Sequence, residues 1–169
     1  MGKRMNQTIR SHLNSEGEAR MVDVGAKGPT RRFALARCEI LMKPETLELL
    51  ESGRLKKGDA FTVAKIAGIL AAKKTSDLIP LCHPLPVEHV EIRFKERSEG
   101  DGFVIEVEVS TIAKTGVEME ALTGAAVAAL TLYDMAKGYD PGIIVTSLRL
   151  VKKTGGKSDY DQSGNHYSE

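Results

Sequence analysis

The chain has 169 residues, of which 41% are hydrophobic and 28% charged, and its formal net charge is +1. That length suits one domain with a core of its own. The near-neutral charge excludes the global positive field that attracts nucleic acid or an acidic membrane, so any anion site has to be built from local clusters of lysine and arginine.

Cys38 and Cys82 are the two cysteines, and neither lies in a C-x-x-C pair, the spacing of many zinc and thioredoxin-like sites. We expect two free thiols, as in a cytoplasmic protein, and no metal site. No uncharged apolar run approaches the roughly 20 residues that a membrane span needs. The polar ends, residues 1–16 and 159–169, are predicted to be flexible tails around a single domain of residues 17–158.

The predicted elements begin with a strand over residues 33–42, which alternates in polarity. Pro44 opens a short helix that ends near Gly53, because a missing N–H costs nothing in the first helical turn. Asp59 is the predicted N-cap of the next helix, which has to end before Pro80. Five apolar residues of that helix follow the i, i+3, i+4, i+7, i+8 spacing of a helical face: Val63, Ile66, Ala67, Leu70 and Ala71.

Two strands then form a predicted hairpin, because residues 90–95 and 103–109 alternate in polarity around a glycine-rich turn at 100–102. A long helix over residues 117–138 follows. It is apolar nearly all round, which predicts that it is buried. The β-branched, apolar residues 143–151 predict a buried strand.

This order of elements is the βαββαβ plan of ferredoxin-like folds. We therefore predict an α+β fold in which an antiparallel sheet carries its helices on one face. Packing on the sheet covers only one side of the long helix, so its remaining apolar side predicts a subunit interface and an oligomer.

Charged residues stand at both ends of the long helix. Asp134 and Lys137, at i and i+3, share a face of its last turn. The helix dipole favours the lysine there and disfavours the aspartate, which indicates a functional role for Asp134. Glu118 and Glu120 lie in the first turn, where the dipole favours acids, so their positions alone favour a structural role over a functional one.

His83 lies in a segment with three prolines, at 80, 84 and 86, which holds it in extended backbone. A histidine held in this way suits ligand binding or proton transfer, and filling a loop is the equally open alternative. Cys82 beside it does not suggest a Cys–His nucleophile, because adjacent residues of extended backbone point in opposite directions. Lys57 precedes a helix and Lys153 follows a buried strand, both common positions for anion sites.

Several uninterrupted motifs together resemble the molybdenum cofactor biosynthesis protein C family, whose members are cyclic pyranopterin monophosphate synthases. The resemblance spans about residues 17–158. The motifs that carry it are Met21-Val-Asp-Val24, Lys57-Gly-Asp59, Asp77-Leu-Ile-Pro-Leu-Cys-His-Pro84, Thr115-Gly-Val-Glu-Met-Glu-Ala-Leu-Thr123, Tyr133-Asp-Met135 and Gly155-Gly-Lys-Ser158.

The resemblance implies a lyase that converts 3′,8-cyclo-7,8-dihydro-GTP to cyclic pyranopterin monophosphate and releases pyrophosphate. It also implies a ferredoxin-like fold and a homo-hexamer, a trimer of dimers with sites at the dimer interface. By the family pattern Asp134 is catalytic, and three lysines belong to the site: Lys57, Lys137 and Lys153. The implied substrate contacts are Leu81, Cys82, His83, Met119 and Glu120, with Glu118 and Arg32 as neighbours. Arg31 is a second candidate for the arginine position.

The implied chemistry needs these residue types. A triphosphate carries about four negative charges, which lysines have to offset. A lysine crowded by other cations has a lowered pKa, so we expect Lys137 or Lys153 to move protons while Asp134 orients or accepts them. Glu120 could receive the N–H groups of the guanine-derived ring. No step requires a cofactor or a metal, although Mg²⁺ could accompany the phosphates.

Two other classes of protein share the predicted topology. One is a non-catalytic ferredoxin-like module that binds a small anion, which a pyrophosphate assay would separate from the enzyme. The other is an RNA-binding sheet, and here the near-neutral charge and the 5% aromatic content argue against it.

Overall fold

The computed structural model describes residues 16–164, which form a sheet of five strands and four helices. The strands are β1 (Thr30–Leu41), β2 (His89–Glu96), β3 (Gly102–Ala113), β4 (Ile144–Thr154) and β5 (Tyr160–Asp161). The helices are α1 (Pro44–Glu51), α2 (Ala60–Lys73), the four-residue α3 (Thr75–Leu78) and α4 (Glu118–Ala136). None of the helices in this part of the chain combines the length and hydropathy that crossing a bilayer requires.

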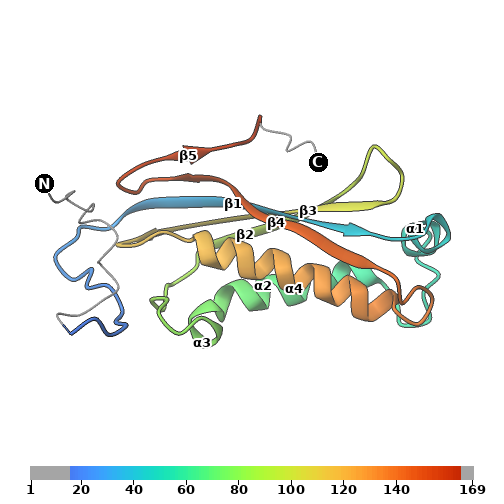
Figure 1. Ribbon diagram of the computed structural model, residues 1–169, viewed down its shortest axis with the longest axis horizontal. Coiled ribbons are helices and arrows are strands. Elements are labelled where there is room, and N and C mark those ends of the chain that lie inside the picture. The colour runs from blue at the N-terminus through green and yellow to red at the C-terminus, as the bar shows by residue number, and fades with distance from the viewer. Residues whose placement is uncertain (1–15, 165–169) are drawn as a thin grey trace, which may run out of the picture.

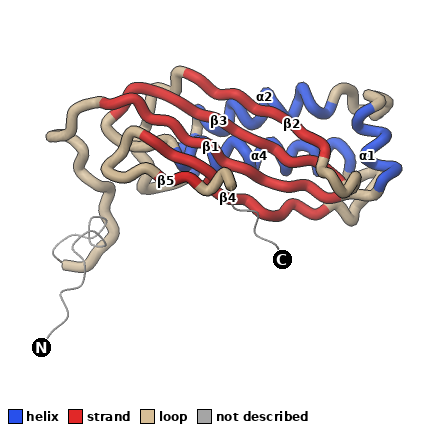
Figure 2. The backbone as a smooth tube through the Cα atoms, turned by 90° about the horizontal axis from the view of Figure 1, so that it is seen from above, coloured by secondary structure: helices blue, strands red, loops and turns tan. Residues whose placement is uncertain are grey.

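The strands lie in the order β2-β3-β1-β4-β5, and every neighbouring pair is antiparallel. The two long helices, α2 and α4, run side by side along one face of this sheet (Figure 1). Figure 2 looks onto the opposite face, with the helices behind the strands. This architecture confirms the predicted α+β, ferredoxin-like plan.

The core lies between the sheet and the two long helices. The strand alternation of β1 turns Ala34, Ala36, Cys38 and Ile40 inward, each with no exposed surface. Where α2 crosses α4, a Cβ added to Gly68 would lie only 2.9 Å from the carbonyl oxygen of Gly124. Small residues are therefore required at this crossing, and they let the two helix backbones approach closely.

The buried face of α2 is not the one that its large apolar residues predict. Val63, Ile66 and Leu70 are about half exposed, at 42%, 54% and 51%. The buried positions of α2 are the small residues Ala60, Ala64, Gly68, Ala71 and Ala72. The close crossing with α4 explains this arrangement, because only small side chains fit between the helices, and the larger ones point away.

The prediction of a buried last strand was also wrong. β4 leaves Ile144 and Leu148 exposed, and Val151 is its fully buried residue. The reason is its place in the sheet. Its outer neighbour β5 pairs only with Lys152 and Lys153, so most of the outer edge of β4 has no neighbouring strand within residues 16–164.

The predicted tails fall mainly on residues 1–15 and 165–169, which lie outside the described residues. Within the described part, Tyr160–Asp161 pair with β4 as the short strand β5. The sheet therefore continues beyond the predicted end of the domain at residue 158.

Candidate functional site

The predicted site residues lie in two groups, one at each end of α4. At the C-terminal end, Asp134 contacts two lysines, and we call these three residues the aspartate cluster. Lys57 Nζ donates to the Asp134 carbonyl oxygen at 2.7 Å and lies 3.2 Å from Oδ2. Lys137 Nζ lies 2.7 Å from Oδ1, which confirms that Asp134 and Lys137 share a helix face. All three side chains are about half exposed.

The two lysines change the protonation behaviour of the aspartate cluster. The hydrogen bonds from Lys137 and then Lys57 lower the pKa of Asp134. In return, the Asp134 carboxylate raises the pKa of Lys137. We expected a lowered pKa for a site lysine, and for Lys137 within one chain this was wrong, because its nearest charge is an anion rather than another cation.

Local structure places Lys57 against α4. It lies in the connection between α1 and α2, just before Gly58, whose positive φ of 92° closes the turn. Asp59 then caps α2 as predicted, accepting a hydrogen bond from the Thr62 N–H at 3.1 Å.

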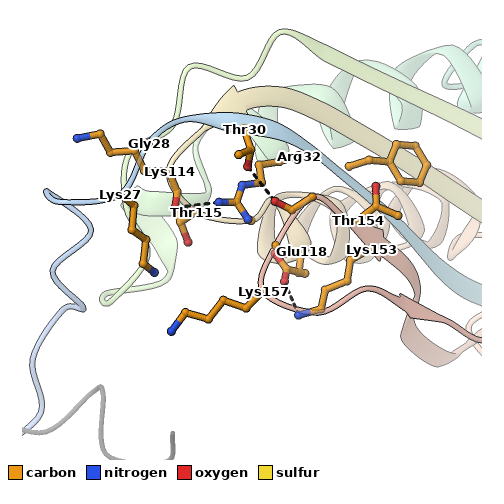
Figure 3. A pocket seen from close by; sticks show the side chains of 14 residues that line it. Lys27, Gly28, Thr30, Arg32, Lys114, Thr115, Glu118, Lys153, Thr154 and Lys157 are labelled. Atoms are coloured by element: carbon orange, nitrogen blue, oxygen red, sulfur yellow. Dashed lines mark hydrogen bonds and ion pairs between the residues drawn. The ribbon is translucent and has the colours of Figure 1, made fainter.

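A cavity of about 430 Å³ lies at the opposite, N-terminal end of α4, and we call it the cationic pocket. Lys153 and Glu118 point toward one another across it, with Nζ and Oε1 3.1 Å apart (Figure 3). Arg32 also lines it, whereas Arg31 does not, and Arg32 donates to the carbonyl oxygens of Ala113 and Lys114. The cationic side chains of the lining are Lys27, Arg32, Lys114, Lys153 and Lys157.

Glycines shape two walls of the cationic pocket. At Gly155, with a φ of 85°, an added Cβ would lie 1.8 Å from the Arg31 carbonyl oxygen, so the turn after β4 lies directly against β1. At Gly116, an added Cβ would lie 1.9 Å from a carboxylate oxygen of Glu118. A side chain at Gly116 would therefore displace Glu118 from Lys153.

A second cavity, of about 320 Å³, adjoins the first, and we call it the acidic pocket. It shares Lys27, Thr115, Gly116 and Glu118 with the cationic pocket, so the two pockets lie side by side. All six predicted substrate residues from the loop after α3 and the first turn of α4 line it: Leu81, Cys82, His83, Glu118, Met119 and Glu120.

The acidic pocket holds a buried carboxyl group. Glu120 is 3% exposed, and burial, together with the charge of Glu118, raises its pKa. His83 Nε2 lies 2.7 Å from the Val22 carbonyl oxygen, which can only accept, so Nε2 carries the proton and Nδ1 is the acceptor of the neutral ring. Burial raises the pKa of the Cys82 thiol, which opposes a nucleophilic thiolate.

The structure therefore brings eight of the eleven predicted residues together at the N-terminal end of α4 and places Asp134, Lys57 and Lys137 at the other end. Glu118 and Asp134 are 16 residues apart on one helix, which is about 24 Å along its axis. Within one chain, Lys153 does not join the other three predicted catalytic residues.

The sequence interpretation gave no site role to three cations of the cationic pocket. Lys157 lay within the Gly155–Ser158 motif, whereas Lys27 and Lys114 were missed altogether. Neither belongs to a pair of basic residues or to a regular helical or strand face that would single it out. The available signal was position in the sequence. Lys27 follows the Met21–Val24 motif in a glycine-containing loop, and Lys114 directly precedes the Thr115–Thr123 motif.

The comparisons with known proteins agree with one another. The model of the MoaC family matches residues 21–156. The cyclic pyranopterin monophosphate synthase of Thermomicrobium roseum is 51% identical over 148 residues, which cover 88% of this chain and 89% of the relative. Proteins of the same name from Pelotomaculum thermopropionicum and a Nostoc species are 53% and 49% identical, over 88% and 92% of this chain and 87% and 93% of those relatives.

Proposed function

The chain belongs to the MoaC family, and from this premise we infer that it is an enzyme, a lyase that acts as a cyclic pyranopterin monophosphate synthase. It converts 3′,8-cyclo-7,8-dihydro-GTP to cyclic pyranopterin monophosphate and releases pyrophosphate. This is an early step of molybdenum cofactor biosynthesis.

The adjacency of the two pockets, which share four lining residues, is the observation that carries this proposal. A nucleotide triphosphate has a strongly anionic end and a ring system rich in N–H donors. The cationic pocket offers four lysines and an arginine to the anionic end. The acidic pocket offers the Glu120 carboxyl group and the free acceptor Nδ1 of His83 to the ring. The nucleotide therefore lies across both, with its phosphates among the cations.

Asp134 enters the same site from a second copy of the chain. About 24 Å of helix separates it from the pockets of its own chain, too far for a side chain to bridge. A two-fold axis that sets two α4 helices antiparallel would place the aspartate cluster of one copy beside the pockets of the other.

Exposed apolar residues on the helical layer support this dimer. Val63, Ile66 and Leu70 of α2 and Leu130 of α4 are exposed, and α2 and α4 pack side by side. An exposed apolar patch of this kind is typical of an interface between subunits. We propose the trimer of such dimers, a homo-hexamer, as the complete enzyme.

Proton movements follow from the charges at each end. Lys137, whose pKa the Asp134 carboxylate raises, is a protonated donor oriented by Asp134. Lys57 adds a positive charge against the phosphates. Lys153, which lies 3.1 Å from Glu118 Oε1 in the cationic pocket, is the second lysine that we propose to move protons, in addition to its contact with the phosphates. Glu120, which keeps its proton to a higher pH than an ordinary glutamate, can return one to the ring.

The reaction needs no organic cofactor and no resident metal in this proposal, and Mg²⁺ can accompany the substrate phosphates. We also place the enzyme in the cytoplasm, acting on a small molecule and not on nucleic acid.

Incubation of the purified protein with 3′,8-cyclo-7,8-dihydro-GTP tests the proposal. The expected result is cyclic pyranopterin monophosphate and pyrophosphate in equal amounts. Binding of the nucleotide without release of pyrophosphate would contradict it and would favour the non-catalytic binding module.

A further inference from the structure

Asp140 is a buried aspartate that neither pocket nor the aspartate cluster includes. It is 1% exposed and lies in the turn between α4 and β4. Its Oδ2 accepts hydrogen bonds from the Lys43 N–H at 3.0 Å and from the Thr46 hydroxyl at 3.4 Å. Its Oδ1 accepts from the Gly142 N–H at 3.1 Å. These donors lower the pKa of Asp140, so it is held as the carboxylate.

One of these bonds satisfies the N–H of the N-cap residue of α1, and another holds the Thr46 hydroxyl in the first turn of that helix. The N-cap residue of α1 is Lys43, whose side chain makes no capping bond, and Pro44 follows it. Asp140 supplies an acceptor at the start of α1 although it lies 97 residues from Lys43 in the sequence. It therefore joins the end of α4 to the start of α1, and Figure 1 shows α1 at that end of α4.

A second hydrogen bond joins the turn after α4 to the loop between α1 and α2. The hydroxyl of Tyr139 accepts from the Lys56 N–H at 3.4 Å, and the next residue, Lys57, holds Asp134. Tyr139 and Asp140 are consecutive. The turn after α4 is therefore hydrogen-bonded to two places in the segment from α1 to the start of α2. One is Lys43, just before α1, and the other is Lys56, in the loop before α2.

We propose that Asp140 is a positioning residue for the catalytic pair, because its carboxylate fixes α1 and the following loop so that Lys57 stays on Asp134. This rests on the proposed function of Asp134 and Lys57. Asp140 lines neither the cationic nor the acidic pocket. In this proposal it acts through the chain between Lys43 and Lys57.

The Asp140→Asn variant tests this. Its side chain keeps the shape but turns one acceptor into an N–H donor that faces another donor, either at Lys43 or at Gly142. The expected result is a rise in KM of about 3- to 10-fold with a smaller change in kcat, in the same direction as Lys57→Ala. In a Lys57→Ala background, Asp140→Asn should change KM by less than about twofold, because Lys57 is already lost.

A matched control separates positioning from general stability. Ile105→Val removes one methylene from the buried core on β3. With Tm values measured for both, Ile105→Val should leave KM unchanged. An equal rise in KM with and without Lys57 would overturn the proposal, as would a rise in the control.

A second readout does not depend on activity. Amine labelling followed by mass spectrometry compares Lys57 with the exposed Lys65 of α2 in the same molecule. Lys57 should label at least about twofold faster in Asp140→Asn than in wild type, because it no longer stays on Asp134, while Lys65 should not change. Unchanged labelling of Lys57 would overturn the inference even if wild type makes product. Absence of product from wild type would instead count against the proposed function.

If Asp140→Asn fails to fold, Thr46→Val removes one of the three donors and keeps the side-chain volume. It should show the same pattern at a smaller size, and an unchanged KM together with unchanged Lys57 labelling would overturn the proposal.

Discussion

The two ends of α4 differ in what they provide. The C-terminal end carries the predicted catalytic aspartate on an open surface, where the Asp134 side chain is 57% exposed. The N-terminal end carries the two adjoining pockets, with the buried Glu120 in one and five cations around the other. Within residues 16–164, the aspartate cluster lines neither the cationic nor the acidic pocket, and those two pockets lie at the other end of the helix.

This difference supports the proposal that each site is built from two copies of the chain. A ligand that fills the pockets of one chain leaves the aspartate cluster of that chain out of reach, since the helix itself holds the two apart. In the proposed two-fold dimer, each α4 helix would contribute to two sites, one at each of its ends, and the helix would hold those two ends a fixed distance apart.

Loss of the aspartate should have the largest effect on activity. Asp134→Ala should lower kcat by about 10²- to 10⁴-fold, the usual contribution of a well-placed acid or base. The Tm should change little, because the side chain is exposed. Glu99→Ala, which removes an exposed carboxylate from the β2–β3 turn, is the matched control and should keep wild-type kcat. Turnover by Asp134→Ala at the wild-type rate would show that the C-terminal end is not part of the site.

Loss of a pocket lysine should act mainly on binding. Lys153→Ala should raise KM by about 10- to 100-fold, as expected when one charge-assisted contact to phosphate is lost. Lys65→Ala replaces an exposed lysine of α2 that lines neither pocket, and it should leave KM unchanged. An unchanged KM in Lys153→Ala would remove the cationic pocket from phosphate binding.

The buried carboxyl group should make stability depend on pH. The folded protein holds the Glu120 proton to a higher pH than the unfolded chain, whose glutamate ionises near 4.5. Above 4.5 the unfolded state binds fewer protons, so the free energy of unfolding falls as pH rises through this window. The glutamine of the Glu120→Gln variant cannot ionise. Urea unfolding at several pH values should therefore show that the free energy of unfolding of this variant does not fall in the same way as pH rises. A parallel pH profile in both proteins would contradict the burial of Glu120 in the acidic pocket.

The smallest effect should come from the thiol beside His83. Because burial raises the pKa of Cys82, it is a neutral thiol and not a nucleophile. Steady-state kinetics of Cys82→Ser should give a kcat within about threefold of wild type. A loss as large as that of Asp134→Ala would bring back the Cys–His nucleophile that the sequence argued against.

Local signals in the sequence predicted local structure well. Asp59 was predicted as a cap and caps α2, and the alternation of residues 90–95 and 103–109 gives the β2–β3 hairpin. These features depend on neighbours in the chain. By contrast, nothing near Asp140 in the sequence indicates its role, because the donors that give it one, Lys43 and Thr46, lie far away in sequence.

Other features depended on packing that periodicity cannot show. Val63, Ile66 and Leu70 have the spacing of a core face, but the close approach of Gly68 to α4 selects the small-residue face instead. By contrast, the i, i+3 spacing did place Asp134 on the same face as Lys137. The expected pKa direction for Lys137 was wrong because it considered the cations of the implied site and not this aspartate, which lies 2.7 Å away.

Mixing two damaged proteins tests most directly whether each site is shared between two copies. Asp134→Ala and Lys153→Ala subunits are dissociated, mixed in equal amounts and reassembled, and activity is assayed below the wild-type KM. If Asp134 and Lys153 of one site come from different chains, half of the dimers are mixed and each has one site with both wild-type residues, so about a quarter of wild-type activity should return. Activity no greater than the mean of the two separate variants would contradict the shared site.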